Sequence, residues 1–84
     1  MRIAVLGAGS WGSALAKVVS DNGHRVHLWG RRPELAESIE QTRENAAFLP
    51  GVHFAATLTA TADLSRALED AEMVVVAIPT HGLR

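Results

Sequence analysis

The feature that most constrains the fold is a short apolar run that ends in three spaced glycines. The run "RIAVL" (residues 2–6) contains β-branched side chains and is typical of a strand buried on both faces. Gly7, Gly9 and Gly12 follow it with the spacing G-x-G-x-x-G. Apolar residues then recur with the period of one helix face, namely Trp11, Ala14, Leu15, Val18 and Val19. A strand, a tight glycine turn and a helix ending near Gly23 are therefore predicted.

The rest of the chain continues to alternate predicted strands with predicted helices. Strands are expected at residues 24–30, at 58–60 and at 73–78, where "MVVVAI" suggests a central strand covered on both faces. Helices are expected from Pro33 to near Asn45 and, after a cap at Thr61 or Asp63, through Ala71. The intervening segment "FLPGVHF" contains a Pro-Gly pair and is predicted to be a turn or loop.

This alternation predicts an α/β fold, because strands joined through helices form right-handed crossovers and a parallel sheet. Numbered along the chain, the strands are expected in the order 3-2-1-4, which is a partial Rossmann-type sheet with flanking helices. No repeat or composition shift marks a second domain, so residues 1–84 are treated as one unit. The ligand crevice of such a sheet lies between its first and fourth strands. Residues 7–12 and 78–81 should therefore face one ligand, with Pro79 among the contacts.

Composition argues against several functional classes. The net charge of −1 and the absence of a basic stripe argue against nucleic-acid or membrane-surface partners, and no stretch approaches membrane-spanning length. The chain has no cysteine, which excludes disulfides and thiolate metal sites and fits a cytoplasmic location. Four histidines show neither metal-ligand spacing nor the makings of a catalytic triad, so no metal site is expected. The histidines are expected to be structural or solvent-facing, and only for His81, after the fourth strand, does a place near the ligand stay open as the less favoured alternative.

The glycine turn predicts a dinucleotide-binding site. In this motif Gly7 makes the tight turn, Gly9 lets a pyrophosphate approach the backbone, and Gly12 lets helix and strand pack closely. The backbone N–H groups of Ser10 and Trp11 should point at phosphate. The Trp11 side chain has two interpretations, a packing role in the core or an aromatic wall beside the dinucleotide. A glycine-rich turn without a ligand is the alternative to the whole motif.

The end of the second predicted strand bears on the choice between NAD and NADP. An acidic residue there would bind the adenosine ribose 2′-hydroxyl of NAD, whereas arginine can pair with the 2′-phosphate of NADP. This chain has Arg31 and Arg32 after Gly30, and no acid. The alternative is that both arginines are solvated charges paired with Glu34 or Glu37.

Taken together, these segments closely resemble the N-terminal part of bacterial NAD(P)-dependent glycerol-3-phosphate dehydrogenases. The resemblance spans essentially the whole chain through "GAGSWGSALA", "LWGRRPE", "RENAAFLPGV" and "TATADLSRALEDAEMVVVAIPTHGLR". "LWGR" joined to a later N-x-x-F-L-P-G is more specific than the glycine motif alone. The resemblance implies reversible hydride transfer between NAD(P)H and dihydroxyacetone phosphate, giving sn-glycerol 3-phosphate for glycerophospholipid synthesis. It also implies cofactor contacts at Ser10, Trp11, Arg31 and Arg32, with Phe48 close by. The alternative for Phe48 is that its side chain fills the core beneath its loop.

The chain departs from that family's pattern in its lysines. In the family, a lysine shortly after this segment and another in a helical C-terminal substrate domain serve substrate binding and catalysis. The only lysine here, Lys17, matches neither. Residues 1–84 are thus expected to be the N-terminal part of a dinucleotide-binding domain, without the substrate domain or a catalytic residue and inactive alone, and a homodimer is implied at full length.

Two other functions remain open at this point. One is a related dehydrogenase with the same first half, such as a ketopantoate, prephenate or sugar-nucleotide enzyme. The other is a sensing module that binds NAD(H) to gate a partner without chemistry. Such modules more often carry an acid at the end of the second strand, so Arg31 argues mildly against one.

Overall fold

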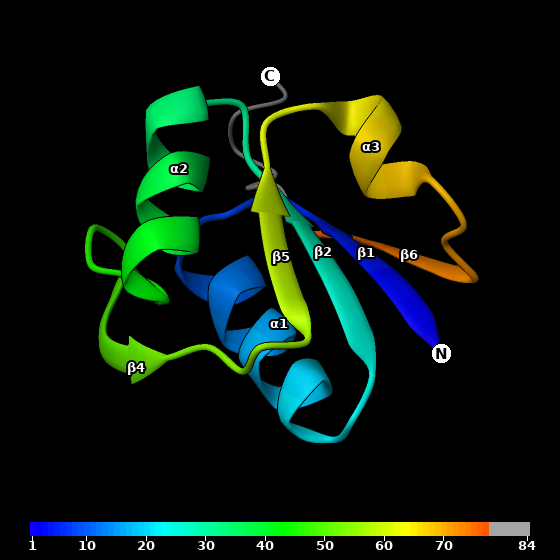
Figure 1. The fold of residues 1–84 in the computed structure, drawn as a ribbon, viewed down its shortest axis with the longest axis horizontal. Helices are drawn as coiled ribbons and strands as arrows, with labels where there is room; N and C mark the ends of the chain where they lie inside the picture. Colours follow the sequence, from blue (N-terminus) through cyan, green and yellow to red (C-terminus); the bar gives the residue numbers. More distant parts are fainter. Residues whose placement is uncertain (78–84) are drawn as a thin grey trace.

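The structure, a computed structural model, describes residues 1–77 (Figure 1). Strands and helices follow one another along this part of the chain as β1 (Arg2–Leu6), α1 (Ser10–Asp21), β2 (Arg25–Trp29), α2 (Pro33–Thr42), β3 (Glu44–Asn45), β4 (Leu49–His53), β5 (Leu58–Thr61), α3 (Leu64–Leu68) and β6 (Met73–Val76). Among these helices, none is long and apolar enough to cross a membrane.

Strands β1, β2, β5 and β6 form one parallel sheet in the order β5-β2-β1-β6. Leu6 of β1 lies opposite both Trp29 of β2 and Val76 of β6, and Trp29 lies opposite Thr61 of β5. The order 3-2-1-4 predicted from the crossover rule is therefore confirmed. Because the strands are parallel, their carboxyl ends share one edge of the sheet.

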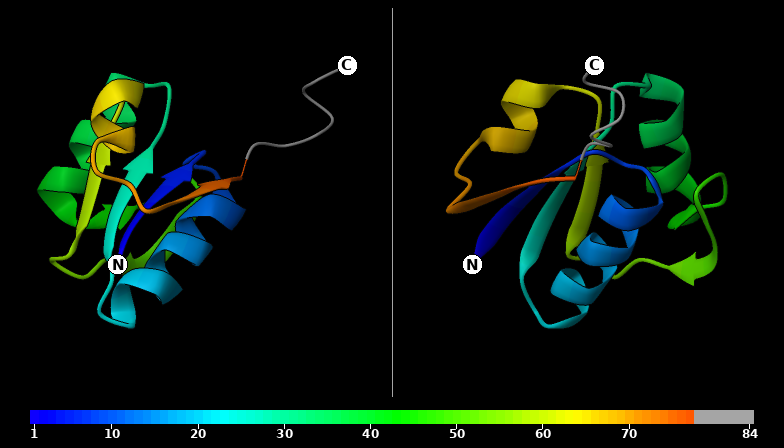
Figure 2. Two further views of the ribbon diagram at one scale, coloured as in Figure 1. Left: turned by 90° about the vertical axis from the view of Figure 1, so that its right-hand side faces the viewer. Right: turned by 180° about the vertical axis from the view of Figure 1, so that it is seen from behind.

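Helices cover the sheet from both sides (Figure 2). α1 and α3 lie on opposite faces of β1 and β2, and α2 packs beside β5. The core between these layers is made of apolar side chains from the parallel sheet and the helices, the largest fully buried ones being Leu28, Ile39, Leu58, Val5 and Val26.

The buried face of α1 differs from the predicted one. The helix places Gly12, Ser13, Ala16 and Ser20 against the sheet, whereas Trp11 and Val18, from the predicted apolar stripe, are 64% and 57% exposed. The reason is close packing, because small side chains let a helix axis approach the strands. Trp11 and Val18 of the predicted stripe therefore face outward, whereas Val19 is partly buried and packs against the core.

The segment after α2 is a β-hairpin, so the prediction of a loop across residues 48–54 is wrong. β3 and β4 pair antiparallel, with a register irregularity between Glu44 and Asn45. α2 also ends at Thr42 instead of near Asn45. Arg43 adopts the left-handed conformation (φ 61°), which terminates the helix and turns the chain into the hairpin.

The last strand and helix also depart from expectation. β6 is an edge strand, and its Met73, Val74 and Val76 are 48%, 47% and 62% exposed, so it is not covered on both faces within residues 1–77. The predicted cap of α3 is confirmed at Asp63, whose carboxylate accepts a hydrogen bond from the Arg66 N–H. α3 ends earlier than predicted, at Leu68.

Candidate functional site

The candidate site lies where the loops leave the carboxyl ends of the strands. Hydrogen bonding between neighbouring strands continues into these loops: the Gly7 N–H donates to the Trp29 carbonyl (2.8 Å), and the Gly30 N–H donates to the Thr61 carbonyl (3.1 Å). On the other side of β1, the Ala77 N–H donates to the Leu6 carbonyl (2.7 Å). The starting points of the loops are thereby fixed by the sheet.

Each glycine of the motif has a distinct structural reason. Gly7 has φ 121°, a backbone conformation that side chains rarely permit. A β-carbon on Gly12 would lie 1.8 Å from the carbonyl oxygen of Gly7, so the helix can pack here only with glycine. Gly9 differs, because its φ of −80° suits any residue and a β-carbon there would project into open space. The fold itself therefore does not require glycine at position 9, and the missing side chain instead leaves the backbone open to a ligand.

The N-terminus of α1 presents unpaired backbone donors. Its N-cap residue is Gly9, with no side-chain cap and no acidic residue in the first turn. The first bond of the helix runs from the Ser13 N–H to the Gly9 carbonyl (2.9 Å), so the N–H groups of Ser10, Trp11 and Gly12 lack helical acceptors. Such an end carries a partial positive charge and suits an anion such as phosphate.

The Trp11 side chain stands beside these donors without entering the core. It is 64% exposed, so a packing role in the core of residues 1–77 is excluded. Its role as an aromatic wall for a ligand stays a prediction. The tryptophan is compatible with the glycine turn because its backbone faces the site while its side chain turns outward.

Arg31 and Arg32 follow β2 at the same edge of the sheet and are both exposed. Within residues 1–77 the ion pairs join Lys17 to Asp21 and Arg43 to Glu40, so the suggested pairing of Arg31 or Arg32 with Glu34 or Glu37 is not observed. Trp29, just before them, donates its indole N–H to the Ala62 carbonyl (3.0 Å). The two arginines therefore follow a strand end, that of β2, which the Trp29 side chain ties to the segment after β5.

Of the other residues considered as ligand contacts, the structure describes Phe48 but not Pro79 or His81. Phe48 lies in the turn of the hairpin and is 41% exposed, so it does not plug the core. No group of three or more histidine, aspartate or glutamate side chains in residues 1–77 could hold a metal ion.

One residue of the site was missed by sequence reasoning. Asn45 is completely buried, and its amide NH₂ donates to the Ala8 carbonyl (2.9 Å) and to the Ser13 hydroxyl (2.8 Å). It joins the hairpin to the glycine turn. The only signal in the sequence was its place at the start of N-x-x-F-L-P-G, which carries no information about a partner 37 residues away.

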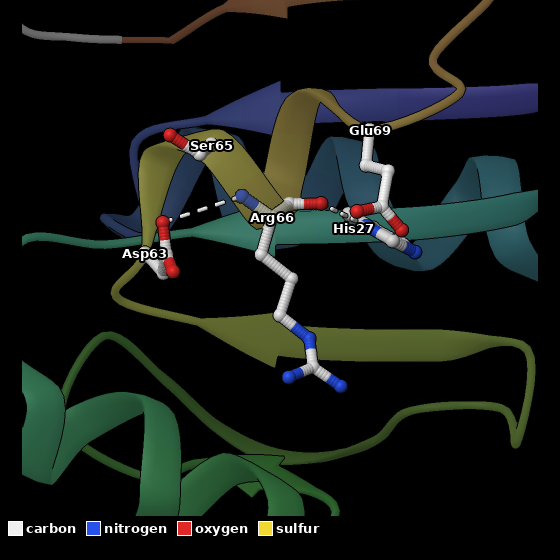
Figure 3. A pocket seen from close by; sticks show the side chains of 5 residues that line it. All are labelled: His27, Asp63, Ser65, Arg66 and Glu69. Carbon is white, nitrogen blue, oxygen red and sulfur yellow. Dashed lines mark hydrogen bonds between the residues drawn. The ribbon is translucent and has the colours of Figure 1, made fainter.

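The structure has a hollow between α3 and β2, away from the glycine turn (Figure 3). It has a volume of about 530 Å³ and is lined by His27, Asp63, Ser65, Arg66 and Glu69. The Nδ1 atom of His27 lies 3.1 Å from the Arg66 carbonyl oxygen, so the imidazole is engaged with the backbone of α3. Except for Asp63, which leads from β5 into α3, the lining residues lie outside the loops at the carboxyl edge.

Comparison with known proteins is consistent with this geometry. The family model described as "NAD-dependent glycerol-3-phosphate dehydrogenase N-terminus" matches residues 2–84. The chain belongs to this family. A Moorella thermoacetica protein named glycerol-3-phosphate dehydrogenase NAD(P)+ is 52% identical over 82 residues, which is 98% of this chain and 24% of the relative. A Bacillus velezensis protein of the same name is 49% identical over 83 residues, or 99% of this chain and 24% of the relative.

Solved structures of the family share this fold. A glycerol-3-phosphate dehydrogenase from Coxiella burnetii superposes with a TM-score of 0.88 at 37% identity, covering 93% of this chain and 24% of that one. The Saccharomyces cerevisiae enzyme gives a TM-score of 0.88 at 31% identity, covering 99% of this chain and 27% of that one. The chain thus spans about a quarter of the length of the relatives it matches.

Proposed function

We propose that residues 1–84 form the NAD(P)H-binding part of a glycerol-3-phosphate dehydrogenase, which interconverts dihydroxyacetone phosphate and sn-glycerol 3-phosphate by hydride transfer. The observation that carries this proposal is the uncapped N-terminus of α1 behind a glycine turn, in a chain of this family. This segment would be the N-terminal part of the dinucleotide-binding domain. The sn-glycerol 3-phosphate made by the whole enzyme would be used in glycerophospholipid synthesis.

The residues at the carboxyl edge fit a dinucleotide. Gly9 leaves open space for a diphosphate, while Gly7 and Gly12 allow the tight turn and the close packing of α1. The N–H groups of Ser10 and Trp11 lack helical acceptors and would bind the diphosphate. Arg31 and Arg32 would hold the adenosine ribose, with Phe48 and Pro79 as further contacts. When bound, the nicotinamide supplies or accepts the hydride. This segment binds and orients the cofactor, and the groups that polarise the substrate carbonyl and bind its phosphate come from the remainder of such an enzyme.

We further propose that NADPH is bound more tightly than NADH. Both arginines are exposed and lack ion pairs within residues 1–77, so neither has a partner there to displace. A guanidinium can form two charge-assisted hydrogen bonds to a 2′-phosphate, which NADH lacks. A homodimer and a cytoplasmic location complete the proposal, supported by the family resemblance and by the absence of cysteine.

The decisive experiment is an oxidation assay on the natural full-length chain that contains these residues. NADPH and NADH are supplied in parallel, with dihydroxyacetone phosphate, ketopantoate or no substrate. Oxidation that depends on dihydroxyacetone phosphate supports the proposed enzyme. Oxidation with ketopantoate alone would indicate a related dehydrogenase. Cofactor binding without oxidation of either substrate would point first to the other related dehydrogenases and then to the sensing module.

A further inference from the structure

The buried amide of Asn45 fixes the orientation of one peptide group in the glycine turn. Its NH₂ donates to the Ala8 carbonyl (2.9 Å), and the Ser13 hydroxyl, which also receives a bond from Asn45, lies 3.4 Å from the same carbonyl. A carbonyl oxygen can only accept, so the NH₂ and not the Oδ1 atom of Asn45 must face it. The Ala8 carbonyl is therefore directed inward, toward the hairpin.

The direction of this carbonyl determines the direction of the next N–H group. In a trans peptide the C=O of one residue and the N–H of the following residue point in opposite directions. With the Ala8 carbonyl turned inward, the Gly9 N–H is turned outward, and it donates no hydrogen bond within residues 1–77. A β-carbon on Gly9 would likewise meet open space. The Gly9 N–H is thus added to the donors at the start of α1.

Glycine at position 9 makes this orientation easy to lose. Turning the peptide over requires rotation about the bonds on either side of it, and glycine accepts positive φ without a steric penalty. The flipped peptide would direct the Ala8 carbonyl oxygen at an incoming phosphate and the Gly9 N–H inward. The glycine that permits close approach therefore needs a separate restraint, which Asn45 supplies.

The other atom of the amide supports this interpretation. The Oδ1 atom of Asn45 is buried and has no hydrogen-bond partner within residues 1–77, which is unfavourable. An apolar side chain of similar size would fill the same space without that cost, but it would leave the Ala8 carbonyl without the NH₂ donor. A role in packing alone does not account for the amide.

We propose that Asn45 is a positioning residue that holds the Ala8–Gly9 peptide with its N–H toward the cofactor diphosphate. The inference rests on the proposed function, because it deepens the description of the same site. Asn45 also accepts a bond from the Phe48 N–H through its own carbonyl (3.2 Å), so the hairpin turn and the glycine turn are connected through one residue.

The test compares two probes in the natural full-length chain. ADP-ribose carries the diphosphate and adenosine does not. The variants Asn45→Ala and Asn45→Ser both remove the donor, since the serine hydroxyl is one bond too short to replace the amide. Phe54→Leu is the matched control: Phe54 directly follows the hairpin and is 5% exposed, so the substitution alters the core without removing the hydrogen bond that Asn45 donates to the Ala8 carbonyl. Melting temperatures are measured for all variants, and affinities well below them.

In both Asn45 variants we expect a loss of about tenfold in ADP-ribose affinity, with adenosine affinity within about twofold of wild type. The chemical-shift change of the Gly9 amide on adding ADP-ribose should also shrink. Phe54→Leu should lower the melting temperature and leave both affinities unchanged. Equal losses for both probes, or unchanged ADP-ribose binding in whichever Asn45 variant folds, would overturn the inference. If the wild-type chain itself bound no ADP-ribose, the proposed function would fail first.

Discussion

The carbonyl oxygen of Gly7 lies 1.8 Å from the place that a β-carbon of residue 12 would occupy. This contact joins the end of β1 to the first turn of α1 through backbone alone, so neither partner can rotate away as a side chain would. It also sets how deeply the helix lies against the sheet.

Gly12→Ala should therefore disturb both the fold and the site. The added methyl group must push α1 away from β1, at a cost of about 2–3 kcal/mol in the free energy of unfolding. Urea unfolding measures that cost, and fluorescence titration with NADPH measures cofactor binding. Gly9→Ala is the matched variant, because its β-carbon meets open space. We expect it to stay within about 0.5 kcal/mol of wild type yet bind NADPH at least about tenfold more weakly. Normal NADPH binding by Gly9→Ala would show that no diphosphate approaches there.

Arg31→Ala should lower affinity for NADPH far more than for NADH. The guanidinium at the end of β2 would lose charge-assisted bonds to the 2′-phosphate, which predicts a loss of about tenfold to a hundredfold for NADPH and little change for NADH. Titration of both cofactors measures the ratio. Arg25→Ala is the control, since Arg25 is another exposed arginine at the opposite end of the same strand. Equal losses for the two cofactors would refute the 2′-phosphate assignment.

The four strands of the parallel sheet could be predicted from local sequence patterns, and their order from the general rules for such sheets. Buried parallel strands are short apolar runs, and the crossover rule restricts how strands joined by helices can be arranged. The loops at the carboxyl edge follow from that order, so the sequence alone predicts that Gly7 and Arg31 lie at one edge of the sheet. The glycine motif added the prediction that a helix begins within this turn, and in the structure α1 begins at Ser10.

Other features were missed because they depend on contacts between distant segments. The periodicity of α1 singled out Trp11 and Val18, but the face that packs is the one whose small side chains clear the Gly7 carbonyl. Likewise, the hairpin after α2 depends on Arg43, whose guanidinium reaches the carbonyls of Ala55 and Leu58. No pattern in the local sequence reports those partners.

Arg43 gives a prediction about stability that is independent of the cofactor. Its side chain donates to the carbonyls of Ala55 and Leu58 and pairs with Glu40, while its backbone is left-handed. Arg43→Ala should lose those bonds and keep the backbone strain, lowering the free energy of unfolding by about 1–3 kcal/mol. Arg43→Gly loses the same bonds but relieves the strain, so it should be the more stable of the two by up to about 1 kcal/mol. Urea unfolding compares them. A less stable Arg43→Gly would contradict the role assigned to the left-handed conformation.

The edge strand β6 predicts how residues 1–84 behave alone in solution. A parallel edge with half-exposed Met73, Val74 and Val76 offers unpaired backbone groups and apolar surface to a second molecule. Sedimentation velocity should show self-association that rises with concentration, and Val74→Lys should reduce it because a charged side chain on an edge strand disfavours pairing. Val18→Lys in α1 is the control, since Val18 is 57% exposed but belongs to a helix and not to the edge strand. If Val18→Lys abolished association and Val74→Lys did not, the contact would lie on the helix face and the edge of β6 would be irrelevant to it.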